Sequence, residues 1–377
     1  MIPKLIYRRR ERRGLRLWNV GLVLVLAFLA ALAIAAAVFF AGWDLLGARG
    51  LKEERRLTSQ TLFDLVKLAF GVVAGAGALV ALVVAYRRQR VDEDGALREA
   101  TRLHTERFTT AVSQLGEESA AVRLGGVHAL AGLADDAPTD LLRQTCIDVL
   151  CAYLRLPYTP QADLPPDDTA ARHAYLALRE VRHTIIRLIR DRLSVDREET
   201  HVSWQGHDLD FTGVVFDGGD FTGAVFAPGA TVSFRGAQFF DGMVNFTRAQ
   251  FCGGTVNFDR AQFLGSMVCF DEVHVCGGAV GFAFAQFCEG RVEFDRARFS
   301  GGTVRFACAR FSGGTVSFNQ SQISAGTVDF TAADLCGSMI RFDGAEGHPP
   351  TDLLRRTGRP LRRGLGGLPA AWLTSTP

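Results

Sequence analysis

Two long apolar runs dominate the N-terminal part of the chain. The first extends from Asn19 to Trp43 without a charged side chain, and the second extends from Leu68 to Tyr86. A helix needs about 20 apolar residues to cross a bilayer, and the first run exceeds the apolar core of about 7 to 15 residues in a cleaved signal peptide. We therefore expect transmembrane helices at 19–43 and 68–86, joined by a short external loop at 44–67.

The distribution of Lys and Arg predicts the orientation of this helical pair. Residues 1–18 carry one Lys and six Arg, and Arg87, Arg88 and Arg90 follow the second run directly. Basic flanks are retained on the cytoplasmic side of a membrane. The expectation is a multi-pass protein of the cell membrane with a basic cytoplasmic N-terminus at 1–18 and both termini in the cytosol.

Small residues recur on both predicted spans at a spacing that favours helix packing. These residues are Ala27, Ala31 and Ala35 on the first span and Gly71 and Gly75 on the second. The two helices are expected to pack on each other or on a second copy, which would give a homodimer. Neither run contains Asp, Glu, Lys, Arg or His, and transport usually requires such groups, so a transporter or channel is disfavoured.

Helical periodicity continues from residue 92 to 191, where it is broken by clear stop signals. Ser119 and Thr139 occupy N-cap positions, and four prolines interrupt the chain before a last amphipathic helix. The segment 120–154 is similar to one helix pair of a HEAT-like array, but one pair does not make an array. The sequence predicts a small all-α cytoplasmic linker domain.

Phenylalanine sets the pattern of the C-terminal half, first every five residues and then every twelve. Val or Ile lies two residues before each Phe of the twelve-residue series, so both side chains point to one face of a strand. Such strands can bury that face by stacking about 4.8 Å apart. The sequence therefore predicts a solenoid with one inward ladder. Its members are Phe234, Phe246, Phe258, Phe270, Phe282, Phe294, Phe306, Phe318, Phe330 and Phe342.

Each twelve-residue unit consists of two five-residue units and a two-residue insertion, as in GGTVNFDRAQFC. The segments DFTGV, VFDGG and DFTGA at 210–224 resemble the pentapeptide-repeat family. That resemblance implies an all-β right-handed quadrilateral β-helix for residues 204–343. With four sides and the two-residue insertions, a coil takes 24 residues and the array has about six coils. The chain as a whole resembles actinobacterial membrane-linked pentapeptide-repeat proteins, a group without an established activity.

Cysteine and histidine usage gives no sign of a metal centre or a cofactor. None of the eight Cys forms a CxxC or a Cys/His pair with zinc-like spacing, so reduced thiols are expected. Cys252, Cys276, Cys288 and Cys336 follow the second Phe series at a position that Ser fills elsewhere. A thiol ladder or redox sensor is one interpretation, and a preference for small Ser-like residues is the one adopted. His128, His173 and His183 lack partners at ligand spacing and are interpreted as ordinary histidines.

The function that these features favour is binding rather than catalysis. There is no nucleophile elbow, P-loop, HExxH or kinase signature, so we expect no catalytic residues, no cofactor and no metal. Solenoids present long regular surfaces, and an outward column is predicted at Asp259, Asp271, Asp295, Ala307 and Asn319. The prediction is a membrane-anchored protein-interaction scaffold or regulator, with the lipid bilayer and an unidentified protein as partners.

The alternative is a DNA-mimic regulator of a topoisomerase or another DNA-binding protein. Between Trp204 and Glu346 there are 15 Asp and Glu against nine Arg, so the predicted solenoid is only mildly acidic and is interrupted by basic residues. The net charge of the whole chain is +2, and no nucleic-acid partner is expected. The segment 347–377, rich in Pro, Gly and Arg, is expected to be a disordered basic tail.

Overall fold

The computed structural model describes residues 59–194, 202–353 and 364–374 of the chain, with scattered helical positions between residues 25 and 44. Two compact units are present, at residues 1–100 and 101–377. Most of the first predicted span, 19–43, lies outside the described residues. The positions of that span that are described, among them Phe28 and Phe40, are helical and exposed.

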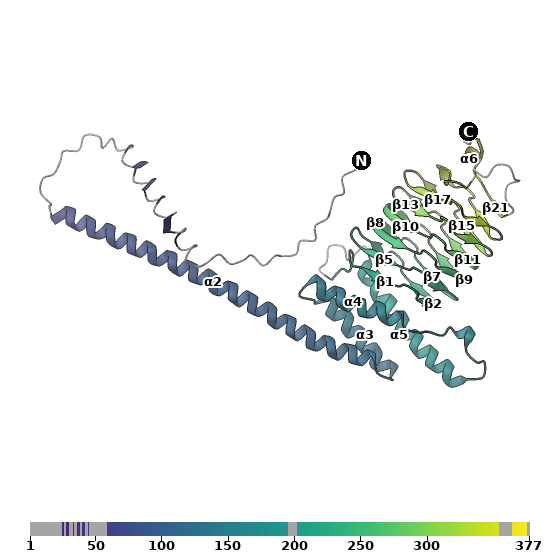
Figure 1. The fold of residues 1–377 in the computed structure, drawn as a ribbon, viewed down its shortest axis with the longest axis horizontal. Helices are drawn as coiled ribbons and strands as arrows, with labels where there is room; N and C mark the ends of the chain where they lie inside the picture. Colours follow the sequence, from purple (N-terminus) through teal and green to yellow (C-terminus); the bar gives the residue numbers. More distant parts are fainter. Residues whose placement is uncertain are drawn as a thin grey trace. The chain divides into compact units, whose positions relative to one another are not determined.

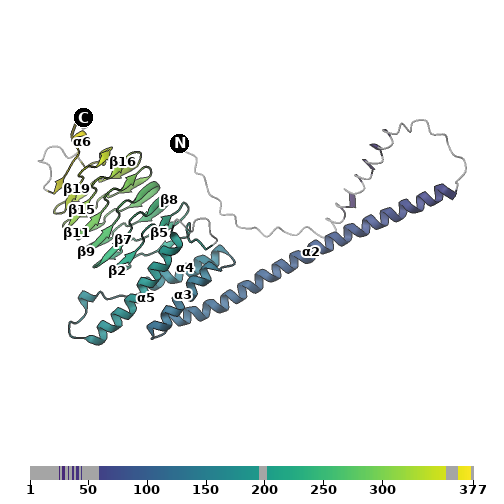
Figure 2. The same cartoon turned by 180° about the vertical axis from the view of Figure 1, so that it is seen from behind.

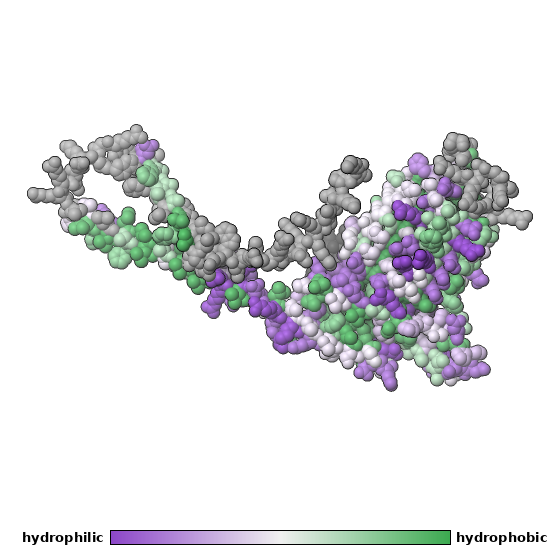
Figure 3. Space-filling model, viewed as in Figure 1, coloured by the Kyte–Doolittle hydropathy of each residue, from purple (hydrophilic) through white to green (hydrophobic). Residues whose placement is uncertain are grey.

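The first unit contains most of helix α2 (Ser59–Leu115). This helix includes the second predicted span, 68–86, and continues without a break into the segment expected to begin the linker domain. Within the part of the chain that the structure describes, α2 is the one helix long and apolar enough to cross a membrane, and none of its 18-residue apolar window is buried. Its apolar side chains form the green stretch in Figure 3.

The second unit begins with the last turns of α2, followed by α3 (Ala120–Asp135), α4 (Asp140–Leu154), a short 3-10 turn η2 (Gln161–Asp163) and α5 (Thr169–Leu193). The predicted N-caps are confirmed in position. Thr139 accepts a hydrogen bond from the Leu142 N–H at 3.3 Å, whereas Ser119 makes no side-chain cap bond. Gly126 lets α3 approach α2 closely, since a Cβ there would lie 2.8 Å from the Ala111 carbonyl oxygen.

A parallel β-solenoid of about six turns follows the helices, as predicted (Figure 1). It has two sheets of 10 and 11 strands. Val256 pairs with Val280, and Val280 pairs with Val304, so one coil takes 24 residues. The predicted coil length is confirmed.

The first sheet consists of β1 (Leu209–Asp210), β4 (Val225–Phe226), β5 (Thr231–Ser233), β8 (Gln250–Asn257), β10 (His274–Gly281), β12 (Arg298–Phe299), β13 (Thr303–Arg305), β16 (Gln322–Ile323), β17 (Thr327–Asp329) and β20 (Glu346–Gly347). The second sheet consists of β2 (Val215–Phe216), β3 (Gly219–Asp220), β6 (Gln238–Phe239), β7 (Met243–Asn245), β9 (Gln262–Cys269), β11 (Gln286–Glu293), β14 (Arg310–Phe311), β15 (Thr315–Ser317), β18 (Asp334–Leu335), β19 (Met339–Arg341) and β21 (Leu365–Gly366). Figure 2 shows the same stack of coils from behind.

The predicted Phe ladder is buried, but it forms two columns rather than one. Because a coil contains two twelve-residue units, successive members of the series lie on opposite sides of the interior. Phe258 and Phe282 stack face to face with ring centroids 4.8 Å apart, and Phe270 and Phe294 stack at 4.7 Å in the other column. The columns meet edge to face, at 5.6 Å and 88° between Phe258 and Phe270. Both geometries are favourable for aromatic pairs.

Tight turns form the corners between the two sheets. In one of them the Ala261 N–H donates to the Phe258 carbonyl oxygen at 3.0 Å, and the third residue, Arg260, has a φ of 60°. Such turns favour glycine at this position, and Gly213 holds it in the first coil. Gly223, Gly236 and Gly344 hold it at three other corners, and at the rest non-glycine residues adopt the left-handed conformation at a cost of about 1–2 kcal/mol each.

Both ends of the aromatic core are closed. At the N-terminal end, Ile186 of α5 packs beside Gly219, and Trp204 is fully buried. At the C-terminal end, β21 extends the second sheet, and α6 (Ala370–Thr374) places Trp372 edge-on against Phe342 with ring centroids 5.4 Å apart. The expectation of a disordered tail at 347–377 is therefore wrong for residues 364–374, because the indole ring of Trp372 is buried against the solenoid. Residues 354–363 lie outside the described part.

Candidate functional site

The most concentrated polar cluster lies where the helices meet the first coil, around the buried carboxylate of Asp217. The hydroxyls of Tyr158 and Tyr175 donate to Oδ2 at 2.6 and 2.7 Å, and Arg179 Nε donates to the same oxygen at 3.1 Å. The Nε2 of His183 lies 3.1 Å from Oδ1. We call these five residues the cap cluster. It joins the loop after α4, helix α5 and the first coil.

The charge state of the cap cluster follows from its hydrogen bonds. Burial alone would raise the pKa of Asp217, but hydrogen bonds from His183, Tyr158 and Tyr175 outweigh it and hold the pKa of this carboxyl well below its usual range. Burial, and then the neighbouring Asp217, raises the pKa of Tyr158. A charged carboxylate that accepts from two phenolic hydroxyls is suited to holding two elements together.

Two arginines extend this junction. Arg182 is buried and donates to the carbonyl oxygens of Leu154 and Val215, both at 2.7 Å. Arg192 donates to both oxygens of Asp135 at 2.6–2.9 Å, and Trp204 Nε1 donates to the same carboxylate at 3.0 Å. The helices therefore form a fixed cap on the solenoid. Sequence reasoning missed this role for His183, while His128 and His173 are exposed.

The predicted outward column at the corners proves to be two columns with a structural role. Asp259 and Ala307 lie at one corner, and Asp271, Asp295 and Asn319 lie at the other, again because a coil holds two units. The side chain of Asp259 accepts the Ala283 N–H at 2.8 Å, and Asp295 accepts the Asn319 N–H at 3.0 Å. The side chains of Asp259 and Asp295 therefore tie successive coils together, and a recognition role for these columns stays a prediction.

Outward positions on the sheet faces are less constrained. On the first sheet one column changes chemistry at every coil. It reads Gln250, His274, Arg298, Gln322 and Glu346. On the second sheet a different outward column reads Met243, Met267, Arg291, Thr315 and Met339. Both sheet faces therefore carry side chains that vary from coil to coil.

The Ser and Cys positions also split into two columns. Cys252, Cys276 and Ser300 lie on the first sheet, whereas Cys288 and Cys336 lie on the second. Small donors recur there because they reach the carbonyl of the preceding coil, as Ser300 Oγ does to Val275 O at 3.5 Å. This explains the Ser-like preference.

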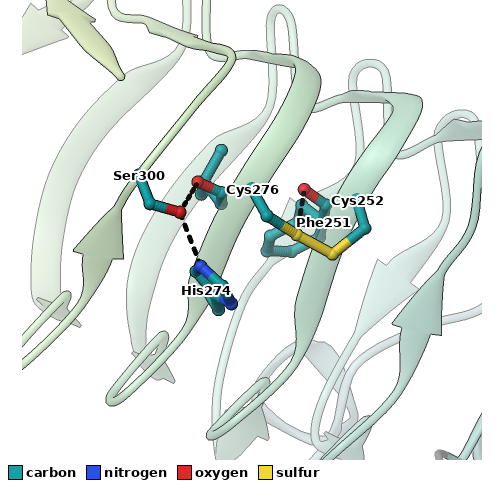
Figure 4. Close-up of a disulfide and its surroundings, with 6 residues drawn as sticks. Phe251, Cys252, His274, Cys276 and Ser300 are labelled. Atoms are coloured by element: carbon teal, nitrogen blue, oxygen red, sulfur yellow. Dashed lines mark hydrogen bonds between the residues drawn. A yellow bond between two sulfur atoms is a disulfide. The ribbon is translucent and has the colours of Figure 1, made fainter. Parts of the chain in front are cut away.

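One disulfide joins Cys252 to Cys276 (Figure 4), so the expectation that all thiols are free is wrong for this pair. It was missed because a period of twelve residues does not reveal which cysteines are neighbours. The other six cysteines are free. Across the described residues, no group of three or more His, Cys, Asp or Glu side chains could hold a metal ion.

The structure does not test the predicted helix-packing residues. Gly71 and Gly75 lie on α2, where a Cβ at either would meet nothing within 4 Å among the described atoms. Ala27, Ala31 and Ala35 lie outside the described residues. Packing between the spans therefore stays a prediction.

Comparison of the chain with known protein families, with curated proteins and with solved structures gave no match.

Proposed function

We propose that this protein is a membrane-anchored interaction scaffold or regulator that presents a β-helix of the pentapeptide-repeat type in the cytosol. The observation that carries the proposal is the contrast within each coil. Inward Val and Phe repeat, while the outward column from Gln250 to Glu346 differs at each step. Repeating cores with varied faces are typical of solenoids that recognise other macromolecules.

The finer fold assignment is part of the proposal. Phe211, Phe216 and Phe221 recur every five residues in the first coil and are fully buried, and Gly213 and Gly223 have the positive φ that such turns favour. These features support a right-handed, four-sided pentapeptide-repeat helix lengthened by two-residue insertions. An experimental structure that showed three-sided or left-handed coils would overturn the assignment.

Anchoring by two spans rests on the apolar runs at 19–43 and 68–86. An apolar helix window without burial needs lipid or a partner to cover it. We expect the full chain to remain in the membrane pellet after alkaline carbonate extraction. Recovery in the soluble fraction would refute anchoring. Packing through Gly71 and Gly75 can be tested by chemical cross-linking of the full chain. The yield of cross-linked dimer should fall in Gly75→Leu and stay unchanged in the control Gly77→Leu. Equal yields from the two variants would contradict packing through Gly71 and Gly75.

Cytosolic orientation can be tested with the chain's own thiols. Cys308 and Cys336 are exposed and free, so a membrane-impermeant maleimide should leave them unlabelled in intact cells and label them after lysis. The Cys252–Cys276 disulfide is the observation that favours the opposite side, because stable disulfides are typical of oxidising compartments. Labelling in intact cells would reverse the proposed orientation.

The scaffold role is tested by proximity labelling. A labelling enzyme is fused after Pro377 in the full chain and, as control, in a chain whose residues 204–377 are replaced by an unrelated soluble domain. Proteins labelled only by the first fusion identify what the solenoid recruits. Identical labelled sets from the two fusions would contradict the scaffold role.

A further inference from the structure

Cys252 and Cys276 occupy the same position on adjacent coils. Their Cα atoms are 4.9 Å apart, close to the strand spacing and within the range that a disulfide requires. All eight cysteines lie in the described part of the chain, and no other two are coil neighbours. Cys288 is flanked at its position by Leu264 and Ser312 on the adjoining coils.

Access to solvent sets this pair apart from the buried thiols. Cys252 and Cys276 are partly exposed on the outer face of the first sheet. Burial raises the pKa of Cys146 to about 11 and that of Cys151 to about 12, so these thiols remain protonated and unreactive at neutral pH. A reductant can therefore reach this disulfide, whereas the exposed Cys308 and Cys336 have no neighbouring thiol with which to form one.

The same backbone accommodates both redox states of the pair. Cys276 Sγ lies 3.7 Å from the Phe251 carbonyl oxygen, and one coil further Ser300 Oγ lies 3.5 Å from the Val275 carbonyl oxygen. A reduced Cys276 can therefore make the hydrogen bond that Ser300 makes. The pair can therefore be reduced while the coil stays folded. A reversible redox site needs this property.

The pair lies beside an irregularity in the ladder between β8 and β10. The strand register shifts on both sides of Gly277, as at a β-bulge, where strands commonly bend. A Cβ at Gly278 would lie 2.1 Å from the Gly254 carbonyl oxygen, so the two coils approach each other here through glycine backbone. A covalent bond beside this bend would resist separation of the coils where the regular ladder is interrupted.

We propose that Cys252 and Cys276 form a redox-modification site, a reversible disulfide that exchanges with a dithiol reductant. The reductant's thiolate attacks one sulfur, the Sγ–Sγ bond breaks, and a mixed disulfide forms. The second thiol of the reductant then displaces the protein sulfur. The protein gains two electrons and two protons, and the reductant leaves as its own disulfide. Oxidation stiffens the bend between these coils, and reduction loosens it. The proposal does not depend on the scaffold role.

The test uses the full detergent-solubilised chain equilibrated in defined ratios of reduced to oxidised dithiothreitol. Free thiols are trapped with a maleimide under native conditions and assigned by mass spectrometry. Cys252 and Cys276 should titrate together as one two-electron transition, with Cys308 free throughout. The oxidised chain should melt about 5 to 10 °C above the reduced chain, as expected for closing a loop of this length. Cys252→Ser should abolish the transition and the shift, and Cys308→Ser should change neither.

Two results would overturn the proposal. The first is reduction of Cys252 and Cys276 by dithiothreitol only after the protein is denatured. The bond would then be a structural disulfide and not a reversible one. The second comes from cells whose thiols are trapped by acid before and after exposure to diamide. A pair that is fully oxidised or fully reduced under both conditions does not respond to the redox state of its compartment.

Discussion

Removing the Asp217 carboxylate tests whether the helices are fixed to the solenoid by the cap cluster. In Asp217→Ala the hydroxyl of Tyr175, which is buried, and that of Tyr158, which is half-buried, lose their acceptor. Each unsatisfied donor costs about 1–3 kcal/mol. Arg179 and His183 are partly exposed and can be rehydrated, so they add less. We expect a total loss of about 3–5 kcal/mol, the range for breaking a buried charge network.

Hydrogen exchange followed by mass spectrometry on the full chain is the appropriate assay, because it separates undocking of the cap from unfolding of the coils. A loss of this size lowers the protection of amides in α5 by about 10²- to 4 × 10³-fold. The matched control is Asp220→Ala. Asp220 pairs with Arg190 and accepts the Thr222 N–H, but its side chain is 45% exposed against 6% for Asp217, so its loss should cost only about 1–2 kcal/mol.

The outcome that would refute this reasoning is equal protection of α5 in the wild type and in Asp217→Ala. The cap would then be held by apolar contacts alone. Equal losses of α5 protection in Asp217→Ala and Asp220→Ala would also contradict it. The free-energy cost of losing a carboxylate would then not depend on its burial. Loss of protection throughout the coils would mean that cap and solenoid unfold as one unit, against the local undocking expected here.

Three further predictions follow from the same contacts. Phe282→Ala removes a fully buried ring stacked at 4.8 Å on both sides and should cost about 3–5 kcal/mol in chemical denaturation, whereas Phe284→Ala, two residues on and exposed, should cost far less. Trp372→Ala should uncover Phe342, raise exchange in β19, and produce self-association in light scattering as the sheet end opens. The lowered pKa of Asp217 means that its contribution is complete above the unfolded Asp pKa of about 3.9 and declines as pH falls further. The stability difference between the wild type and Asp217→Asn should thus shrink as pH falls below 4, and a difference that stays the same from pH 5 to pH 2 would contradict this assignment.

The solenoid could be predicted from the sequence because its physical cause is local. Val256 and Phe258 lie two residues apart, so strand geometry alone places both on the inner face, and both are buried. The length of the coil was also accessible, since twelve residues enclose too little space for large rings. The local pattern does not show which Phe ring stacks on which. That depends on how many twelve-residue units make up one coil.

The cap cluster could not be predicted, since its members lie 34 to 59 residues from Asp217 in sequence. Tyr175, Arg179 and His183 share one face of α5 by their four-residue spacing, but which part of the chain that face contacts depends on how α5 docks. One signal was available. Asp217 occupies the position that Leu264, Cys288 and Ser312 take in later coils, so a lone carboxylate stands in an apolar or small-residue column. A charge at such a place requires partners from outside the repeat.

The difference between the sequence period and the structural period decides which side chains of this solenoid can interact. The pattern repeats every half coil, but vertical neighbours are 24 residues apart, as Cys252 and Cys276 are. Cys276 and Cys288 are closer in sequence and chemically equivalent, yet they lie on different sheets. Two positions one repeat apart share an environment without sharing a contact. Any partner that reads this surface along one face therefore meets every second repeat, and the two faces can diverge independently while the same core is maintained.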